Sequence, residues 1–168
     1  MRKLLAVTAL LLLAACGFQL RGVATLPFET LYVDGSGNPA LAVEISRAIR
    51  LGTQAKLTDK AEDAQMVLQV QGATRGKRIL ALSGAGRVRE YELIYRVGFR
   101  LADKDGRDLI TTQPIEMRRA MLWDDTQILA KQGEEAMLYA DMQKDVIGQL
   151  MRRLAKAKPQ LADATPQR

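Results

Sequence analysis

The chain of 168 residues contains no histidine and only one cysteine, Cys16. Without histidine it lacks the side chain that most often serves as a general base and as a metal ligand near neutral pH. A single cysteine excludes an intramolecular disulfide and the paired cysteines of common zinc and redox sites. These absences argue against cytosolic redox chemistry and against the usual metal-dependent enzymes.

Motifs for nucleophilic catalysis are also missing. The three serines lie in neither a G-x-S-x-G elbow nor an S-x-x-K motif: Ser36, Ser46 and Ser83. Carboxylate pairs occur at residues 124–125 and 134–135, but we expect the first at a helix start and the second on a helix surface, where structural roles suffice. The G-x-G at residues 84–86 has no third glycine and is typical of a turn. We therefore predict no catalytic residue, no metal ligand and no cofactor, and we predict that the chain is not an enzyme.

No apolar run reaches the roughly 20 residues that a membrane-spanning helix needs. The N-terminus instead carries Arg2 and Lys3, an apolar stretch at residues 4–13, and small residues directly before Cys16. This order is typical of a secretory signal, so we predict a signal peptide over residues 1–15. Leu-Ala-Ala-Cys resembles a bacterial lipobox, which implies diacylglycerol and an N-acyl chain on Cys16. An ordinary signal peptide with an incidental cysteine is the alternative.

The residue after Cys16 is Gly17 rather than the aspartate that retains lipoproteins at the inner membrane. We therefore expect the cell outer membrane, with the protein held there by its lipid. Loss of Arg2 and Lys3 with the signal would lower the net charge from +6 to +4. Such a mildly basic domain suits anionic lipid headgroups, but the same charge is common in proteins that bind nothing anionic. An exported protein is not expected to bind nucleic acid.

Hydrophobic periodicity predicts four strands and two helices in the mature chain. Strands are expected at residues 31–33, 66–82, 90–101 and 108–123, and helices at 39–52 and from about 124 to 157. Asn38 before Pro39 is a strong helix start, and Asp-Gly at residues 105–106 favours a hairpin between the last two strands. Pro114 favours an edge position for the fourth strand because proline cannot donate a ladder hydrogen bond.

These elements predict an α+β fold, a two-layer sandwich with two helices packed on one face of a four-stranded mixed sheet. Tyr95 and Phe99 are expected on the buried face of the third strand. We expect residues 16–157 to form one domain that begins with the lipid-anchor segment. The tail at residues 158–168 lacks periodicity and is expected to be disordered.

Several segments resemble the LptE family of lipopolysaccharide (LPS) assembly lipoproteins. They are Cys-Gly-Phe-Gln-Leu-Arg-Gly at 16–22, Leu-Pro at 26–27, REYEL at 89–93 and ILAK at 128–131. The resemblance implies an outer-membrane lipoprotein that plugs the β-barrel LptD, helps that barrel assemble, and binds LPS during delivery to the outer leaflet. It also implies an LPS contact at Lys131, with Arg87 and Arg89 as further candidates.

The predicted topology brings these three cations to one end of the sheet, because an antiparallel fourth strand returns the chain to the start of the third. A second hypothesis of a different class remains open. It is a stand-alone periplasmic lipoprotein enzyme or envelope-binding module with an unrecognised cleft.

Overall fold

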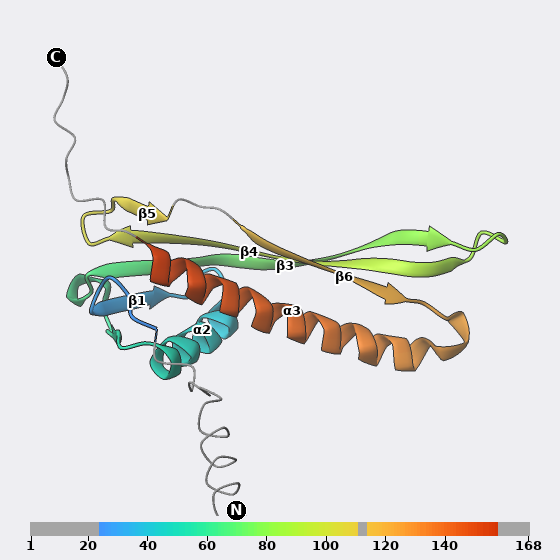
Figure 1. The fold of residues 1–168 in the computed structure, drawn as a ribbon, viewed down its shortest axis with the longest axis horizontal. Coiled ribbons are helices and arrows are strands. Elements are labelled where there is room, and N and C mark those ends of the chain that lie inside the picture. Colours follow the sequence, from blue (N-terminus) through green and yellow to red (C-terminus); the bar gives the residue numbers. More distant parts are fainter. Residues whose placement is uncertain (1–23, 111–113, 158–168) are drawn as a thin grey trace, which may run out of the picture.

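The computed structural model describes residues 24–110 and 114–157. Cys16, the predicted signal over residues 1–15 and the predicted tail at 158–168 lie outside these ranges. A long antiparallel hairpin is the main element of the described chain (Figure 1). It consists of β3 (Met66–Leu82) and β4 (Val88–Asp103), which pair along almost their whole lengths.

The sheet has six strands rather than the predicted four, while the α+β class and the mixed sheet are confirmed. β1 (Thr30–Asp34) pairs in parallel with β3 on one side and with β2 (Lys56–Leu57) on the other. β5 (Asp108–Ile110) and β6 (Ile115–Leu122) both pair antiparallel with the remaining edge of β4.

Two physical features account for the difference in strand number. The predicted strand over residues 108–123 is split into β5 and β6, and Pro114, which cannot donate a ladder hydrogen bond, lies directly before β6. The edge position predicted for the strand that contains Pro114 is confirmed, because β6 pairs with β4 alone. β2 was missed because a strand of two residues has no hydrophobic period.

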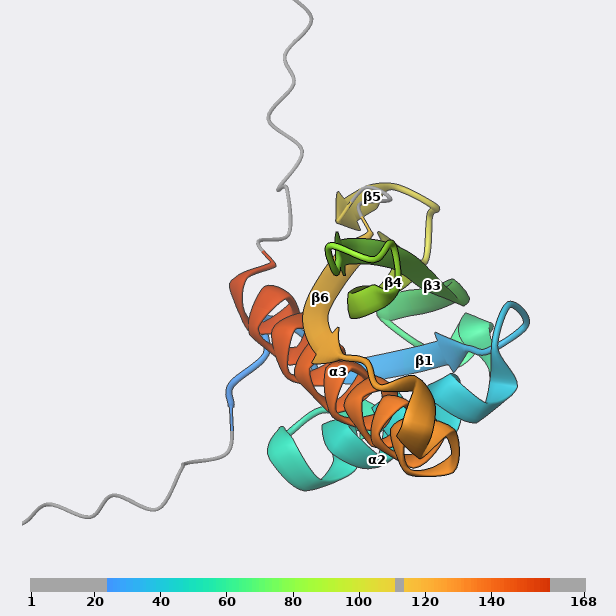
Figure 2. The same ribbon diagram turned by 90° about the vertical axis from the view of Figure 1, so that its right-hand side faces the viewer.

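Both helices cover the same face of the sheet, as predicted (Figure 2). α2 (Pro39–Gly52) begins where expected: the Asn38 side chain accepts a hydrogen bond from the Leu41 N–H at 3.1 Å. α3 (Ile128–Lys156) follows a short 3₁₀ turn, η2 (Asp125–Gln127). A second 3₁₀ turn, η1 (Ala61–Asp63), precedes β3. In the described ranges, no helix is long and apolar enough to cross a membrane.

The hydrophobic core lies between the helices and the sheet. On β4 the predicted alternation is confirmed, with Tyr95 and Phe99 both buried. Five residues of α3 are buried in the same core: Tyr139, Met142, Val146, Leu150 and Leu154. Two successive side-chain hydrogen bonds cross this layer. The Tyr95 hydroxyl donates to Gln143 at 3.0 Å, and the Gln143 amide donates to Glu44 at 2.7 Å. These hydrogen bonds connect α2 and α3 to the sheet.

The molecule is elongated and its two ends differ (Figure 1). At one end lie α2, β1 and β2. At the other, which we call the distal end, lie the β3–β4 turn at residues 83–87 and the start of α3. The turn is closed by the Ser83 N–H, which donates to the Arg87 carbonyl at 2.7 Å.

Candidate functional site at the distal end

The structure brings the three predicted cations to the distal end. Arg87 lies in the β3–β4 turn, Arg89 near the start of β4, and Lys131 in the first turn of α3. The end of β6 is joined to the start of β4, because the Trp123 N–H donates to the Arg89 carbonyl at 2.8 Å. The start of α3 therefore lies at the same end as the β3–β4 turn (Figure 1). This agrees with the prediction that the antiparallel fourth strand returns the chain to the start of the third.

The three cations differ in their surroundings. Arg87 and Arg89 are exposed, and neither forms an ion pair with any of the described residues. Lys131 instead pairs with Glu134 at 2.7 Å, and only 18% of its side chain is exposed. The two arginines are therefore available to an external anion, whereas Lys131 must exchange its partner to bind one.

Exposed apolar side chains also gather at the distal end. They belong to the last part of β3, the end of β6 and the start of α3: Ile79, Leu80, Leu82, Leu122, Ile128 and Leu129. We call these six residues the distal apolar patch. Leu129 is 84% exposed. Exposed apolar clusters of this kind commonly mark binding surfaces for proteins, lipids or apolar ligands.

The distal apolar patch was not predicted from the sequence, although a signal for it was present. β3 alternates clearly at its start, but residues 79–82 read Ile-Leu-Ala-Leu without alternation. The pairing of β3 with β4 is irregular in this segment, between Ile79 and Ala81 and again between Ala81 and Leu82. Uninterrupted apolar residues near an exposed turn could have indicated a surface with apolar residues on both faces.

A cluster of aromatic and charged side chains fixes α3 to the hairpin beside the patch. The Lys77 ammonium lies 4.2 Å from the centre of the Tyr91 ring and 4.5 Å from that of Trp123. It also pairs with Glu135 at 2.6 Å. Such cation–π and ionic contacts stabilise the position of both elements, since the ammonium is shared by two rings and a carboxylate.

Tyr139 adds a second connection between α3 and β3. Its hydroxyl donates to the Gly76 carbonyl at 2.6 Å, and the Arg75 guanidinium lies 5.1 Å from its ring centre. Burial raises the pKa of Tyr139 above its ordinary value. A hollow of about 560 Å³ lies between α3 and β3 at this point, lined by Arg75, Lys77, Trp123 and Tyr139 among others.

The carboxylate pairs considered as catalytic candidates have structural partners. Asp124 accepts a hydrogen bond from the Thr126 N–H at 2.9 Å, and this bond chiefly holds the pKa of Asp124 below its ordinary value. Asp125 accepts from the Trp123 indole N–H at 2.7 Å. Glu134 and Glu135 are the ion-pair partners already described. Within the described ranges, no group of three or more potential ligands could hold a metal ion.

Comparison with known proteins adds an independent line of evidence. The profile of the family described as "LptE: Lipopolysaccharide-assembly" matches residues 28–154. The chain is 27% identical over 151 residues to a protein of Photorhabdus laumondii named LPS-assembly lipoprotein LptE, covering 87% of this chain and 80% of that protein.

Solved structures of two lipoproteins share the fold. The solution structure of an uncharacterized lipoprotein B from Nitrosomonas europaea is 44% identical, with a TM-score of 0.72, over 83% of this chain and 90% of that one. The crystal structure of the rare lipoprotein B from Shewanella oneidensis is 28% identical, with a TM-score of 0.67, over 76% of this chain and 95% of that one. The similarity therefore extends over most of the chain and includes both the hairpin and α3.

Proposed function

Because the chain belongs to the lipopolysaccharide-assembly LptE family, we propose that it is a lipid-anchored, non-catalytic envelope protein whose distal end binds LPS. The family assigns it to LPS assembly and transport. The proposal adds the contact surface: Arg87 and Arg89 bind phosphate groups of LPS, and Lys131 joins them by exchanging Glu134 for the ligand. The distal apolar patch lies against the acyl chains.

The observation that carries this proposal is the combination of unpaired arginines and exposed apolar side chains at one end of the molecule. The lipid part of LPS carries phosphates beside several acyl chains, so its recognition requires cationic and apolar groups side by side. Arginine binds phosphate through two parallel hydrogen bonds and keeps its charge at any physiological pH. Apolar side chains beside it gain free energy when acyl chains cover them.

A direct titration of LPS tests the surface. With Arg87, Arg89 and Lys131 all replaced by Glu, we expect affinity to fall at least about tenfold, because charge-assisted hydrogen bonds contribute roughly 1.5–3 kcal/mol each. The remaining binding should depend less on salt, since screening acts on the exposed charges that were removed. Arg87→Glu with Arg89→Glu should account for most of the loss, and Lys131→Gln alone for less.

A control variant carries the same change in charge at the opposite end of the molecule: Lys56→Glu, Lys60→Glu and Lys104→Glu. These three lysines are exposed in the described structure. We expect this variant to bind LPS nearly as the native protein does. If the distal triple variant binds as tightly as the native protein, its three cations are ordinary surface charges and the site lies elsewhere.

We further propose that the protein acts at the outer membrane as the plug and assembly partner of the LptD barrel. Membership of the family supports this, as does the long hairpin, whose face away from the helices is partly exposed and open to a surrounding partner. Cys16, with its acyl chains, would hold the protein at the membrane.

Co-purification distinguishes this role from that of a stand-alone periplasmic enzyme or binding module. The mature chain with a C-terminal tag should isolate a stable complex with a barrel protein of much larger mass. The same preparation from cells carrying Cys16→Ser should retain part of that complex, because the folded domain supplies the contacts. Recovery of a monomer from native membranes would contradict the partnership.

A further inference from the structure

The outer face of α2 has an unusual composition for a solvent-facing helix surface. Val43, Ser46, Arg47, Arg50 and Leu51 share this face, because they follow the helical spacing of three and four residues. Val43 is 61% exposed and Leu51 78% exposed, while residues on the opposite face are buried in the core. The face therefore combines large apolar side chains with two arginines.

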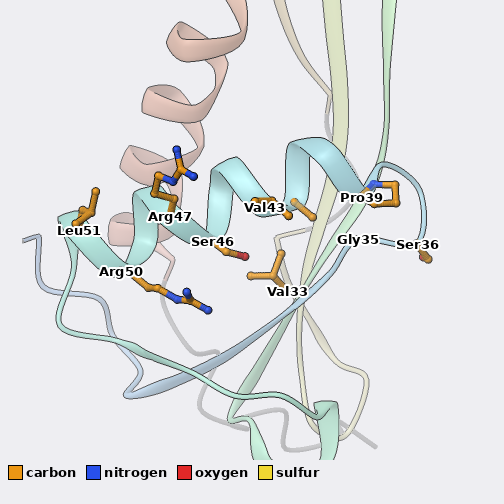
Figure 3. A pocket seen from close by; sticks show the side chains of 10 residues that line it. Val33, Gly35, Ser36, Pro39, Val43, Ser46, Arg47, Arg50 and Leu51 are labelled. Carbon is orange, nitrogen blue, oxygen red and sulfur yellow. The ribbon is translucent and has the colours of Figure 1, made fainter.

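A hollow of about 730 Å³ lies between this face and the end of β1. Figure 3 shows the side chains of Val43, Ser46 and Leu51 on α2, and Val33 on the neighbouring strand. None of the described residues that line the hollow is acidic. Arg47 and Arg50 also form no ion pair with any residue in the described ranges. The surface is thus cationic, apolar and without an internal partner.

The position of α2 relative to the anchor indicates what covers this surface. The Ala24 N–H donates to the Gly52 carbonyl at 2.8 Å, and Ala24 forms a parallel bridge with Thr53. The described chain therefore begins beside the end of α2 that carries Leu51. Ala24 follows Cys16 by eight residues, which reach at most about 29 Å when fully extended. An acylated Cys16 thus limits the distance between this end of α2 and the lipid surface to about 29 Å.

We propose that the outer face of α2 lies on the membrane to which Cys16 is anchored. Leu51 and Val43 enter the boundary between headgroups and acyl chains, and Arg47 and Arg50 bind the phosphates of anionic glycerophospholipids. The inference rests on the anchor proposed above, and it adds a second attachment that fixes the orientation of the domain. Because α2 and the hairpin turn lie at opposite ends, the proposed lipid contact and the distal end are separated along the length of the molecule (Figure 1).

The test uses the lipidated mature chain in vesicles. Since Cys16 is the only cysteine and carries the lipid, Leu51→Cys supplies the single free thiol, which is labelled with an environment-sensitive fluorophore. Leu129→Cys is the matched control, because Leu129 is similarly exposed but lies at the distal end. In vesicles containing phosphatidylglycerol, nitroxide-labelled lipid should quench the probe at residue 51 at least twofold more than the probe at residue 129.

A charge reversal tests the contribution of the arginines. Arg47→Glu with Arg50→Glu should lower quenching at residue 51 toward the level of residue 129, whereas Arg87→Glu with Arg89→Glu should leave it unchanged. Thermal unfolding followed by circular dichroism checks that both variants remain folded. The quenching at residue 51 should also decrease when phosphatidylglycerol is replaced by a zwitterionic lipid.

Two results would overturn the inference while leaving the anchor intact. Equal quenching at residues 51 and 129 in an acylated, vesicle-bound chain would show that α2 does not touch the lipid. A signal that rises with protein density and is independent of anionic lipid would assign this face to a second copy of the chain. If the mass of the mature chain shows no acyl groups on Cys16, the anchor is wrong and this inference with it.

Discussion

Phe99 lies on the helix-facing side of β4 with 1% of its surface exposed, and the Arg153 guanidinium lies 5.5 Å from its ring centre. We predict that Phe99→Ala lowers the free energy of unfolding by about 3–5 kcal/mol, because it removes a large buried ring and leaves a cavity. Urea unfolding measures the difference. Ile79→Ala, at an exposed site on the same hairpin, should change stability little. An unchanged midpoint for Phe99→Ala would place the ring outside the core.

At this scale the sequence predicted buried residues better than surface contacts. Tyr95 and Phe99 could be assigned to the core because strict alternation leaves only one apolar face on a strand. The pairing of Lys131 with Glu134 was visible as a spacing of three residues on a helix, but spacing alone does not say that the pair forms. The position of Lys77 between two rings depends on elements distant in sequence, so no local pattern could indicate it.

The start of α3 depends on Asp124, which caps the preceding turn. Because the Thr126 N–H hydrogen bond lowers the pKa of Asp124 in the folded protein, the ionised carboxylate stabilises the fold. This contribution is complete above the unfolded pKa of about 3.9 and is lost as the pH falls through the folded value. We predict that Asp124→Ala lowers the melting temperature at pH 7 and that the difference from the native protein shrinks in strong acid.

Thermal melts between pH 7 and pH 2.5 measure this dependence. Asp59→Ala removes an exposed loop carboxylate and serves as the control, with little expected change over the same range. A difference in melting temperature between Asp124→Ala and the native protein that stays constant across the series would show that capping by the ionised carboxylate is not the cause.

Helices and strands that extend over several repeats of a hydrophobic pattern were predicted, and the shortest strands were not. α2, α3, β3 and β4 each extend over several repeats of a hydrophobic pattern, and their predicted and observed bounds agree closely. β2 is a two-residue pairing with β1 and carries no period. β5 and β6 pair with different parts of the same edge of β4. The presence of Pro114 alone did not determine where one strand ends and the next begins.

For the whole molecule, topology predicted that the candidate cations lie at one end, while most of the apolar surface at that end emerged only from the structure. The return of β6 along β4 brings the start of α3 to the end that holds the β3–β4 turn. Residues 79–82, which lack alternation, were a signal for the β3 part of the distal apolar patch. Its parts on β6 and α3 could not be deduced, because each of these segments could have been buried by a neighbour. The two proposed contact surfaces, α2 for phospholipid and the distal end for LPS, lie at opposite ends of the fold.

The proposed contact between LPS and the distal end can be detected in cells by site-specific photo-crosslinking. A photoreactive amino acid is placed at Leu82 and Leu129 in the distal apolar patch, and at Leu51 on α2 as an equally accessible position. We expect crosslinks to LPS at residues 82 and 129, and none above background at residue 51. Crosslinks to LPS at residue 51 with none at residues 82 and 129 would show that LPS binds elsewhere on the molecule.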